Sequence, residues 1–181
     1  MKKSVIEPAN VLQEKLFEIP AIVTSFGKQE SNILKKWLHW LEELESIFEK
    51  YNFTQCAEIA GYRASLISSY SFPTEKRTQK RKQVNHAALV SVQPVQQILS
   101  DKSNELNEKI NQVRTLIKQI LIPAKDAGMI NYDPKTDFTA FMESLLIQFK
   151  SHEQVRPSIN SAIALIGKYD VIRILAEEIE L

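Results

Sequence analysis

Two stretches of this chain carry apolar residues at alternating intervals of three and four, and this spacing limits the fold more than any other feature. The first lies in residues 31–51, and its spaced residues are Leu34, Trp37, Leu41, Leu44, Phe48 and Tyr51. The second runs from Pro94 to about Leu121, and its spaced residues are Leu99, Leu106, Ile110, Val113, Ile117 and Ile120, with Ser103 at the missing position. Such spacing places apolar side chains on one face of an α-helix. Each stretch therefore predicts a long helix with one buried seam.

Glycine is scarce, with four in 181 residues, and this favours helices over strands. Strands joined by tight turns use glycine freely. We find no internal repeat and no convincing strand in the sequence. The predicted fold class is all-α: a helical bundle built on two long antiparallel helices, with shorter helices packed around them.

The shorter helices are located by their apolar spacing and by residues that cap or break helices. They are expected at residues 9–19, 53–70, 74–90, 137–151, 157–166 and 171–179. Pro20 and Pro123 are expected to end or kink a helix, because proline has no amide hydrogen to donate. Asp137 and Asp170 precede apolar runs and are expected to cap the helices that follow.

Proline and glycine cluster between residues 123 and 136, and we expect a boundary there. Residues 1–123 would form an N-terminal helical bundle that includes a basic segment at 75–91. Residues 124–181 would form a C-terminal three-helix segment packed on the same core.

The chain has one cysteine, Cys56, which excludes an intramolecular disulfide and a zinc site with several cysteines. Its apolar neighbours predict a small buried side chain. Charged residues follow soon after Met1, which leaves no room for the apolar core of a signal peptide. No segment has the roughly 20 mostly apolar residues that a membrane helix needs. We therefore expect a cytoplasmic protein that does not enter a membrane.

The sequence shows no motif for catalysis or for binding a metal or cofactor. The three histidines, His39, His86 and His152, are far apart. There is no glycine-rich phosphate loop and no serine in a Gly-x-Ser-x-Gly turn. We expect no metal, no cofactor and no enzymatic activity.

Positive charge is concentrated in one short segment. The whole chain carries a formal net charge of +1, whereas residues 75–91 contain five basic and one acidic side chain, a net charge of +4. The basic residues are Lys76, Arg77, Lys80, Arg81 and Lys82. Two pairs of them lie one helical turn apart, and like charges at that spacing repel. A polyanion would relieve this repulsion and release its counterions.

Residues 53–72, FTQCAEIAGYRASLISSYSF, resemble the helix-turn-helix of phage repressors. In that motif an alanine lies where the two helices touch, a glycine takes the turn, and an apolar residue six positions later packs the second helix back. Ala57, Gly61 and Ile67 occupy these positions. The resemblance implies that the exposed face of the second helix, including Arg63, contacts DNA.

The same segment can also form one continuous helix of the core. Ile59 and Leu66 are apolar where a helix-turn-helix normally exposes polar groups. In a single helix Gly61 would cost only about 1 kcal/mol relative to alanine. The sequence favours this interpretation and leaves the first one open.

Together these features predict a non-enzymatic nucleic-acid-binding subunit or accessory factor within a larger assembly. The residues expected to contact phosphates are Arg63, Lys76, Arg77, Lys80, Arg81 and Lys82. An acidic protein surface is the alternative partner for the same segment. The alternative function is a protein–protein adaptor or structural subunit, which would bind a partner or a second copy through its helix seams and through Trp37 and Trp40.

Overall fold

The computed structural model describes residues 4–28, 30, 32–71 and 77–179, and the side chains of all of these except residues 70, 71 and 77–82. Within these residues the chain folds into helices and no strand, so the prediction of an all-α protein is confirmed. The helices of the described part are α1 (Ile6–Gly27), α2 (Ile33–Lys50), α3 (Cys56–Ser71), α4 (Arg77–Asp126), α5 (Phe138–Ser151), α6 (Arg156–Ile166) and α7 (Lys168–Glu178).

The chain divides into two compact units. Unit 1 comprises residues 1–9 and 104–181, and unit 2 comprises residues 10–103. The division therefore falls inside α4, and differs from the boundary expected at 123–136. The reason is that the apolar seam of α4 continues through the helix, so that one helix supplies buried side chains to both units.

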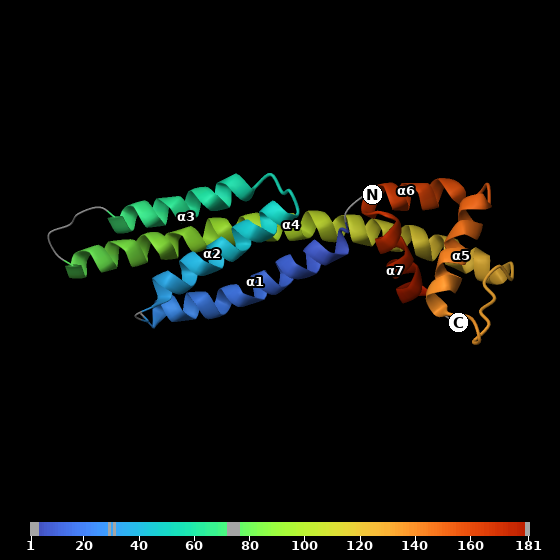
Figure 1. The fold of residues 1–181 in the computed structure, drawn as a ribbon, viewed down its shortest axis with the longest axis horizontal. Helices are drawn as coiled ribbons and strands as arrows, with labels where there is room; N and C mark the ends of the chain where they lie inside the picture. The colour runs from blue at the N-terminus through green and yellow to red at the C-terminus, as the bar shows by residue number, and fades with distance from the viewer. Residues whose placement is uncertain (1–3, 29, 31, 72–76, 180–181) are drawn as a thin grey trace. The chain divides into compact units, whose positions relative to one another are not determined.

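Unit 2 is a bundle of four helices that alternate in direction (Figure 1). It contains most of α1, all of α2 and α3, and the first half of α4. Short connections join successive helices, as is usual in up-and-down bundles. Polar contacts join α2 to its neighbours: Arg63 of α3 donates to Glu45 (2.7 Å), and Trp37 donates to Ser91 of α4 (3.0 Å).

α2 confirms the first predicted seam. Its buried residues share one face and are Ile33, Trp37, Trp40, Leu41, Leu44 and Phe48. The helix begins at Ile33 and ends at Lys50, close to the predicted bounds. The seam fixes the face that α2 turns toward the core of unit 2.

α4 is longer than expected, because it continues through two prolines. The sequence predicted separate helices before and after Pro94 and an end or kink at Pro123, whereas α4 runs from Arg77 to Asp126. A proline in a helix interior costs about 3 kcal/mol, since it removes a backbone hydrogen bond and crowds the preceding turn. Val92 and Val95, on either side of Pro94, are buried in unit 2, and this packing offsets the cost.

The expected pair of long antiparallel helices is found only in part. α4 has 50 residues and α2 has 18, so one of the two is long. α2 and the first half of α4 run in the same direction along unit 2 (Figure 1). The antiparallel neighbours of α2 are α1 and α3. α1 also continues past Pro20, to Gly27, where the sequence predicted an end near residue 19.

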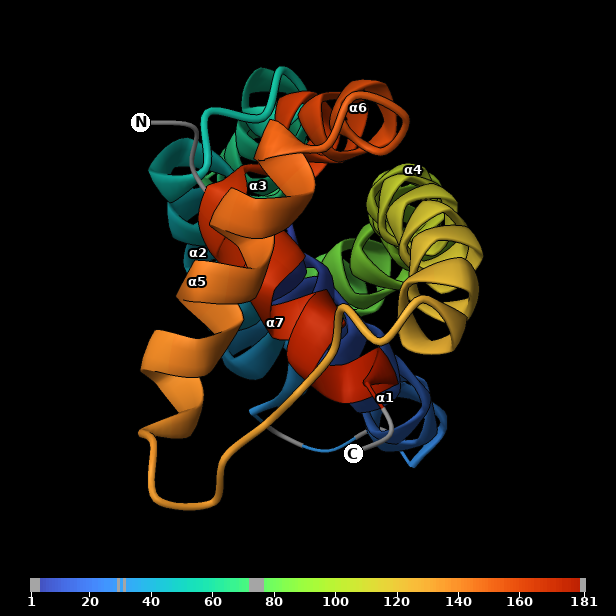
Figure 2. The ribbon, with the colours of Figure 1, turned by 90° about the vertical axis from the view of Figure 1, so that its right-hand side faces the viewer.

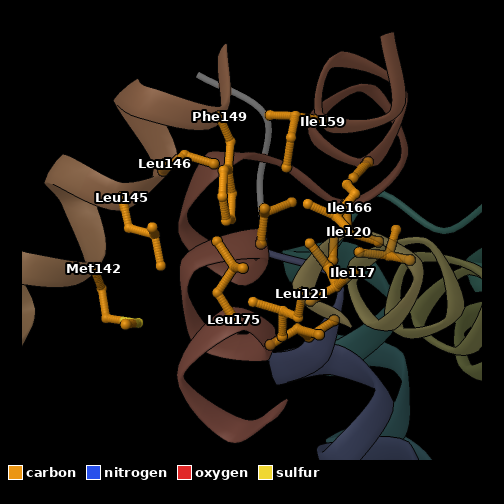
Figure 3. Close-up of a cluster of buried hydrophobic side chains, with 14 of the residues drawn as sticks. Ile117, Ile120, Leu121, Met142, Leu145, Leu146, Phe149, Ile159, Ile166 and Leu175 are labelled. Carbon is orange, nitrogen blue, oxygen red and sulfur yellow. The ribbon is translucent and has the colours of Figure 1, made fainter. Parts of the chain in front are cut away.

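Unit 1 packs α5, α6, α7 and the second half of α4 around one apolar cluster (Figure 2). The labelled members of this cluster in Figure 3 are Ile117, Ile120, Leu121, Met142, Leu145, Leu146, Phe149, Ile159, Ile166 and Leu175. The predicted starts of α5 and α6 are confirmed. Asp137 accepts a hydrogen bond from the amide of Ala140 (2.9 Å), and Pro157 lies in the first turn of α6.

Asp170 does not cap α7, as the sequence predicted, because α7 begins two residues before it. Its buried carboxylate instead accepts hydrogen bonds at the start of α1. Oδ2 accepts from the amides of Val5 (2.5 Å) and Ile6 (3.0 Å), and Oδ1 accepts from the hydroxyl of Ser4 (2.8 Å). The same hydroxyl accepts from the amide of Glu7 (3.1 Å), as a helix-capping serine does.

Candidate nucleic-acid interface

The basic run lies at the start of α4, at one end of unit 2. Residues 77–82 form the first turns of this helix. Lys76 lies outside the described residues, and the side chains of Arg77, Lys80, Arg81 and Lys82 are also outside the part that the structure describes. The position of the run is therefore given by the backbone of α4.

The hydrogen bond between Trp37 and Ser91 shows which residues of α2 and α4 lie side by side along the bundle. Nε1 of Trp37 donates to Oγ of Ser91 at 3.0 Å, and both side chains are buried. Residues 77–82 precede Ser91 by 9 to 14 positions, which corresponds to about 14–21 Å along a helix with a rise of 1.5 Å per residue. The run therefore lies well before the level of Trp37.

The acidic face of α2 lies beyond Trp37 along the axis of the bundle, on the opposite side from the basic run. Its glutamates follow Trp37 by 5 to 12 positions, and they are Glu42, Glu43, Glu45 and Glu49. Because α2 and α4 run in the same direction, the acidic face and the basic run are separated by about 20 Å or more along the bundle. That distance is too long for an ion pair within unit 2.

Glu43, one of these glutamates, is paired with a lysine of α1. Oε2 of Glu43 lies 2.7 Å from Nζ of Lys15, which also lies 3.0 Å from Oε2 of Glu18. The hydrogen bond from Lys15 lowers the pKa of Glu43. Burial alone would lower the pKa of Lys15, but the hydrogen bonds and charges of Glu43 and Glu18 together raise it. The acidic face of α2 is thus engaged with α1.

Arg63 lies apart from the basic run. Its Nε donates to Oε2 of Glu45 at 2.7 Å, and its side chain is 31% exposed. It precedes the end of α3 by eight residues, about 12 Å along the helix axis. Arg63 precedes the run by 13 residues, and its ion pair with Glu45 holds it beside the acidic face of α2, away from the run. The structure holds Arg63 between α3 and α2.

The segment that resembles a helix-turn-helix is a single helix. α3 continues through Gly61 from Cys56 to Ser71, and no turn interrupts it. Ile59 and Leu66 are buried, at 0% and 3% exposed, so the interpretation as one core helix is confirmed and the helix-turn-helix is wrong. The physical reason is the apolar row through these two residues, which needs an unbroken helix to face the core of unit 2.

The face of α3 that carries Ala57, Ala64 and Ile67 is not buried. Ile67, which a helix-turn-helix would pack inside, is 45% exposed, and Ala57 and Ala64 are exposed. Cys56 is half-buried, and its Sγ lies 3.7 Å from the carbonyl oxygen of Glu45. Burial raises the pKa of this thiol, with a smaller contribution from the nearby glutamates. Cys56 is thus less buried than the sequence predicted.

The two tryptophans are core residues, which corrects their expected role as a contact surface. Trp37 is 0% and Trp40 is 5% exposed, and their rings stack with centroids 4.9 Å apart. Nε1 of Trp40 donates to Oε2 of Glu18 at 2.6 Å. α1 covers Trp40 through Glu18 and Lys15, a contact that depends on how the two helices pack and that the sequence does not show. A partner would not reach either indole without opening unit 2.

Histidine and glutamate side chains lie close together at one place on α2. In the described part of the chain, no group of three His, Cys, Asp or Glu side chains could hold a metal ion. His39 lies 3.7 Å from Glu42 and 3.3 Å from Glu43, which follow it by three and four residues on α2. All three side chains are exposed.

Unit 1 has a shallow surface groove of about 290 Å³ beside α7. Its apolar lining includes Leu121, Ile122 and Ile130. Lys118 and Glu178 also line it and are joined by an ion pair of 3.2 Å. The groove therefore has an apolar floor, and the charges of Lys118 and Glu178 at its border are paired with each other.

No helix within residues 4–28, 32–71 and 77–179 combines the length and the apolar character needed to cross a membrane. Comparisons with family models, with curated proteins and with solved structures find no match for this chain.

Proposed function

We propose that this chain is a non-enzymatic nucleic-acid-binding subunit that contacts phosphates through the basic segment at the start of α4. The observation that carries the proposal is the position of this segment. It holds a net charge of +4, and the acidic face of α2 lies about 20 Å or more away along the bundle.

Elsewhere in the described residues, ion pairs hold many of the cations. Lys15 pairs with Glu43, Arg63 with Glu45 (2.7 Å each). Arg114 pairs with Glu177 in unit 1 (2.6 Å). The basic run has one acidic residue in its own segment, at position 75. Its positive charge is thus the least balanced in the sequence.

Lysine and arginine on a helix suit contacts to the phosphate backbone. Such contacts give affinity and a strong dependence on salt, and they carry little sequence information. We therefore expect similar affinity for nucleic acids of different sequence. Because Arg63 is held by Glu45, the proposal rests on Lys76, Arg77, Lys80, Arg81 and Lys82.

The direct test reverses the charge of the segment. A variant with Lys76, Arg77, Lys80 and Arg81 replaced by glutamate should lose binding to nucleic acid in a mobility assay at moderate salt. Its helical circular dichroism should match that of the wild type, since residues 77–82 lie in the first turns of α4.

A matched control makes the same four charge reversals in unit 1. The control positions are exposed and are Lys125, Lys135, Lys150 and Lys168. This variant has the same net charge as the first and should keep most of the binding. Equal losses in the two variants would mean that only the overall charge matters, and unchanged binding in the first variant would contradict the proposal.

A second candidate function is a protein–protein adaptor, and one side chain favours it. Phe17 on α1 is 73% exposed and borders a shallow depression lined by Asn10, Gln13 and Glu14. Single apolar residues are common on protein surfaces, so this feature carries less weight than the basic segment. The binding of a partner through Phe17 would respond little to salt, which distinguishes it from binding to phosphates.

A further inference from the structure

We infer that the lysines on either side of the connection between α1 and α2 form a second part of the phosphate-binding surface, so that the site takes a nucleic-acid chain long enough to span both parts. We call the described residues 28, 30 and 32–36 the α1–α2 corner. This inference rests on the proposed function of the basic segment and extends it to residues that the sequence analysis did not single out.

The α1–α2 corner is itself positively charged. It contains Lys28, Lys35 and Lys36 against one acidic residue, Glu30, a net charge of +2. Nζ of Lys36 lies 2.8 Å from Oε2 of Glu30, and this hydrogen bond lowers the pKa of Glu30. The only carboxylate of the corner is thereby engaged, while Lys28 and Lys35 are exposed.

The corner and the basic segment lie at the same end of unit 2 (Figure 1). α1 ends and α2 begins there, and the start of α4 lies at that end as well. Since Trp37 is level with Ser91, Lys35 is level with about residue 89 of α4. The turns at 77–82 then lie about 10–18 Å further along the axis.

These dimensions set a minimum length for the ligand. Phosphates along one strand of a duplex are about 3.4 Å apart, so about five of them span the distance from Lys35 to the first turn of α4. A chain of about six nucleotides would reach both parts, whereas a shorter one would contact a single part. A mononucleotide or inorganic phosphate could not bridge them. The chemistry selects a phosphodiester chain rather than an isolated phosphate group.

The test measures affinity against ligand length with the full chain. Oligothymidylates of about 2 to 12 nucleotides should bind the wild type with an affinity that rises with length until the strand reaches both parts of the site and then levels off. The variant Lys28→Glu/Lys35→Glu should lose this rise. Its plot of log affinity against log salt should become less steep by about 1.4, because each lost single-strand phosphate contact removes about 0.7 from the slope.

The matched control is Lys135→Glu/Lys150→Glu, which makes the same charge change at exposed positions of unit 1. It should keep both the dependence on length and the salt slope. Lys28→Gln/Lys35→Gln removes the charges without adding new ones and should show the same losses as the glutamate variant, in smaller measure.

The outcomes separate this inference from the proposed function. If the fourfold charge reversal in the basic segment abolishes binding while Lys28→Glu/Lys35→Glu keeps the length dependence and slope of the wild type, the α1–α2 corner is not part of the site. If the fourfold variant still binds, both proposals fail. If polyglutamate of equal charge competes as well as the oligonucleotide does, the ligand is an acidic protein and the inference of a nucleic-acid chain is overturned.

Discussion

Three hydrogen-bond donors from the first residues of α1 converge on the carboxylate of Asp170, which is 1% exposed. A buried carboxylate needs such donors, and buried amides need an acceptor. The residue that the sequence assigned to the start of α7 therefore holds the start of α1. The sequence contained a sign of this start: Ser4 and Glu7 have the spacing of a capping box.

Replacement of Asp170 by alanine should lower the free energy of unfolding of unit 1 by about 2–3 kcal/mol, because the amides of Val5 and Ile6 lose a charged acceptor. Urea unfolding followed by far-ultraviolet circular dichroism measures this change. Asp126→Ala, at an exposed position, serves as the control and should have little effect. Equal effects of the two variants would show that the bonds to Asp170 do not stabilise the fold.

Apolar periodicity predicted the elements well where one face of a helix packs against a single core. α2 and α5 are the clearest cases, since each begins within two residues of the predicted position. The helix boundaries predicted at prolines were wrong. Pro20 and Pro94 lie inside helices because buried residues on both sides hold the helix together, and this packing cannot be known from local sequence.

α3 offers a direct test of the single-helix interpretation at Gly61. A methyl group added there would meet no atom within 4 Å, and the residue lies in the interior of a helix. Gly61→Ala should therefore raise the free energy of unfolding by up to about 1 kcal/mol, since alanine favours the helix. In a helix-turn-helix the same change would destabilise the protein, because a turn with positive φ disfavours alanine.

Gly128 is the matched control for this measurement. It follows the end of α4 with a φ of 66°, a conformation that favours glycine. Gly128→Ala should lower the free energy of unfolding by about 1 kcal/mol. Opposite signs for the two variants would support the continuous helix α3, and a loss at Gly61 as large as that at Gly128 would contradict it.

On the scale of the whole molecule, a net charge of +1 conceals an uneven distribution. The basic segment opens α4 at one end of unit 2, while the acidic residues of α2 lie further along the bundle. The sequence could locate the basic segment at 75–91, because charge is visible without a fold. It could not show that the α1–α2 corner lies at the same end, since that depends on how α1, α2 and α4 align.

The division into units was also beyond the reach of sequence patterns. The seam of α4 continues without interruption through residues 103 and 104, where the two units divide. The cluster of proline and glycine at 123–136 marks a loop after α4 rather than the edge of a unit. Contacts distant in sequence, such as those of Asp170 with α1, decide which residues belong together.

The salt dependence of nucleic-acid binding tests the central claim most directly. The affinity of the full chain for a duplex should be measured between about 50 and 200 mM salt. We expect a linear fall of log affinity with log salt, with a slope of about −4.5 to −6.3, because five to seven basic residues would each contact a phosphate at about −0.9 per contact. The fourfold charge-reversed variant should show no measurable binding at moderate salt. A wild-type protein that binds with no salt dependence, or does not bind at the lowest salt, would contradict the account.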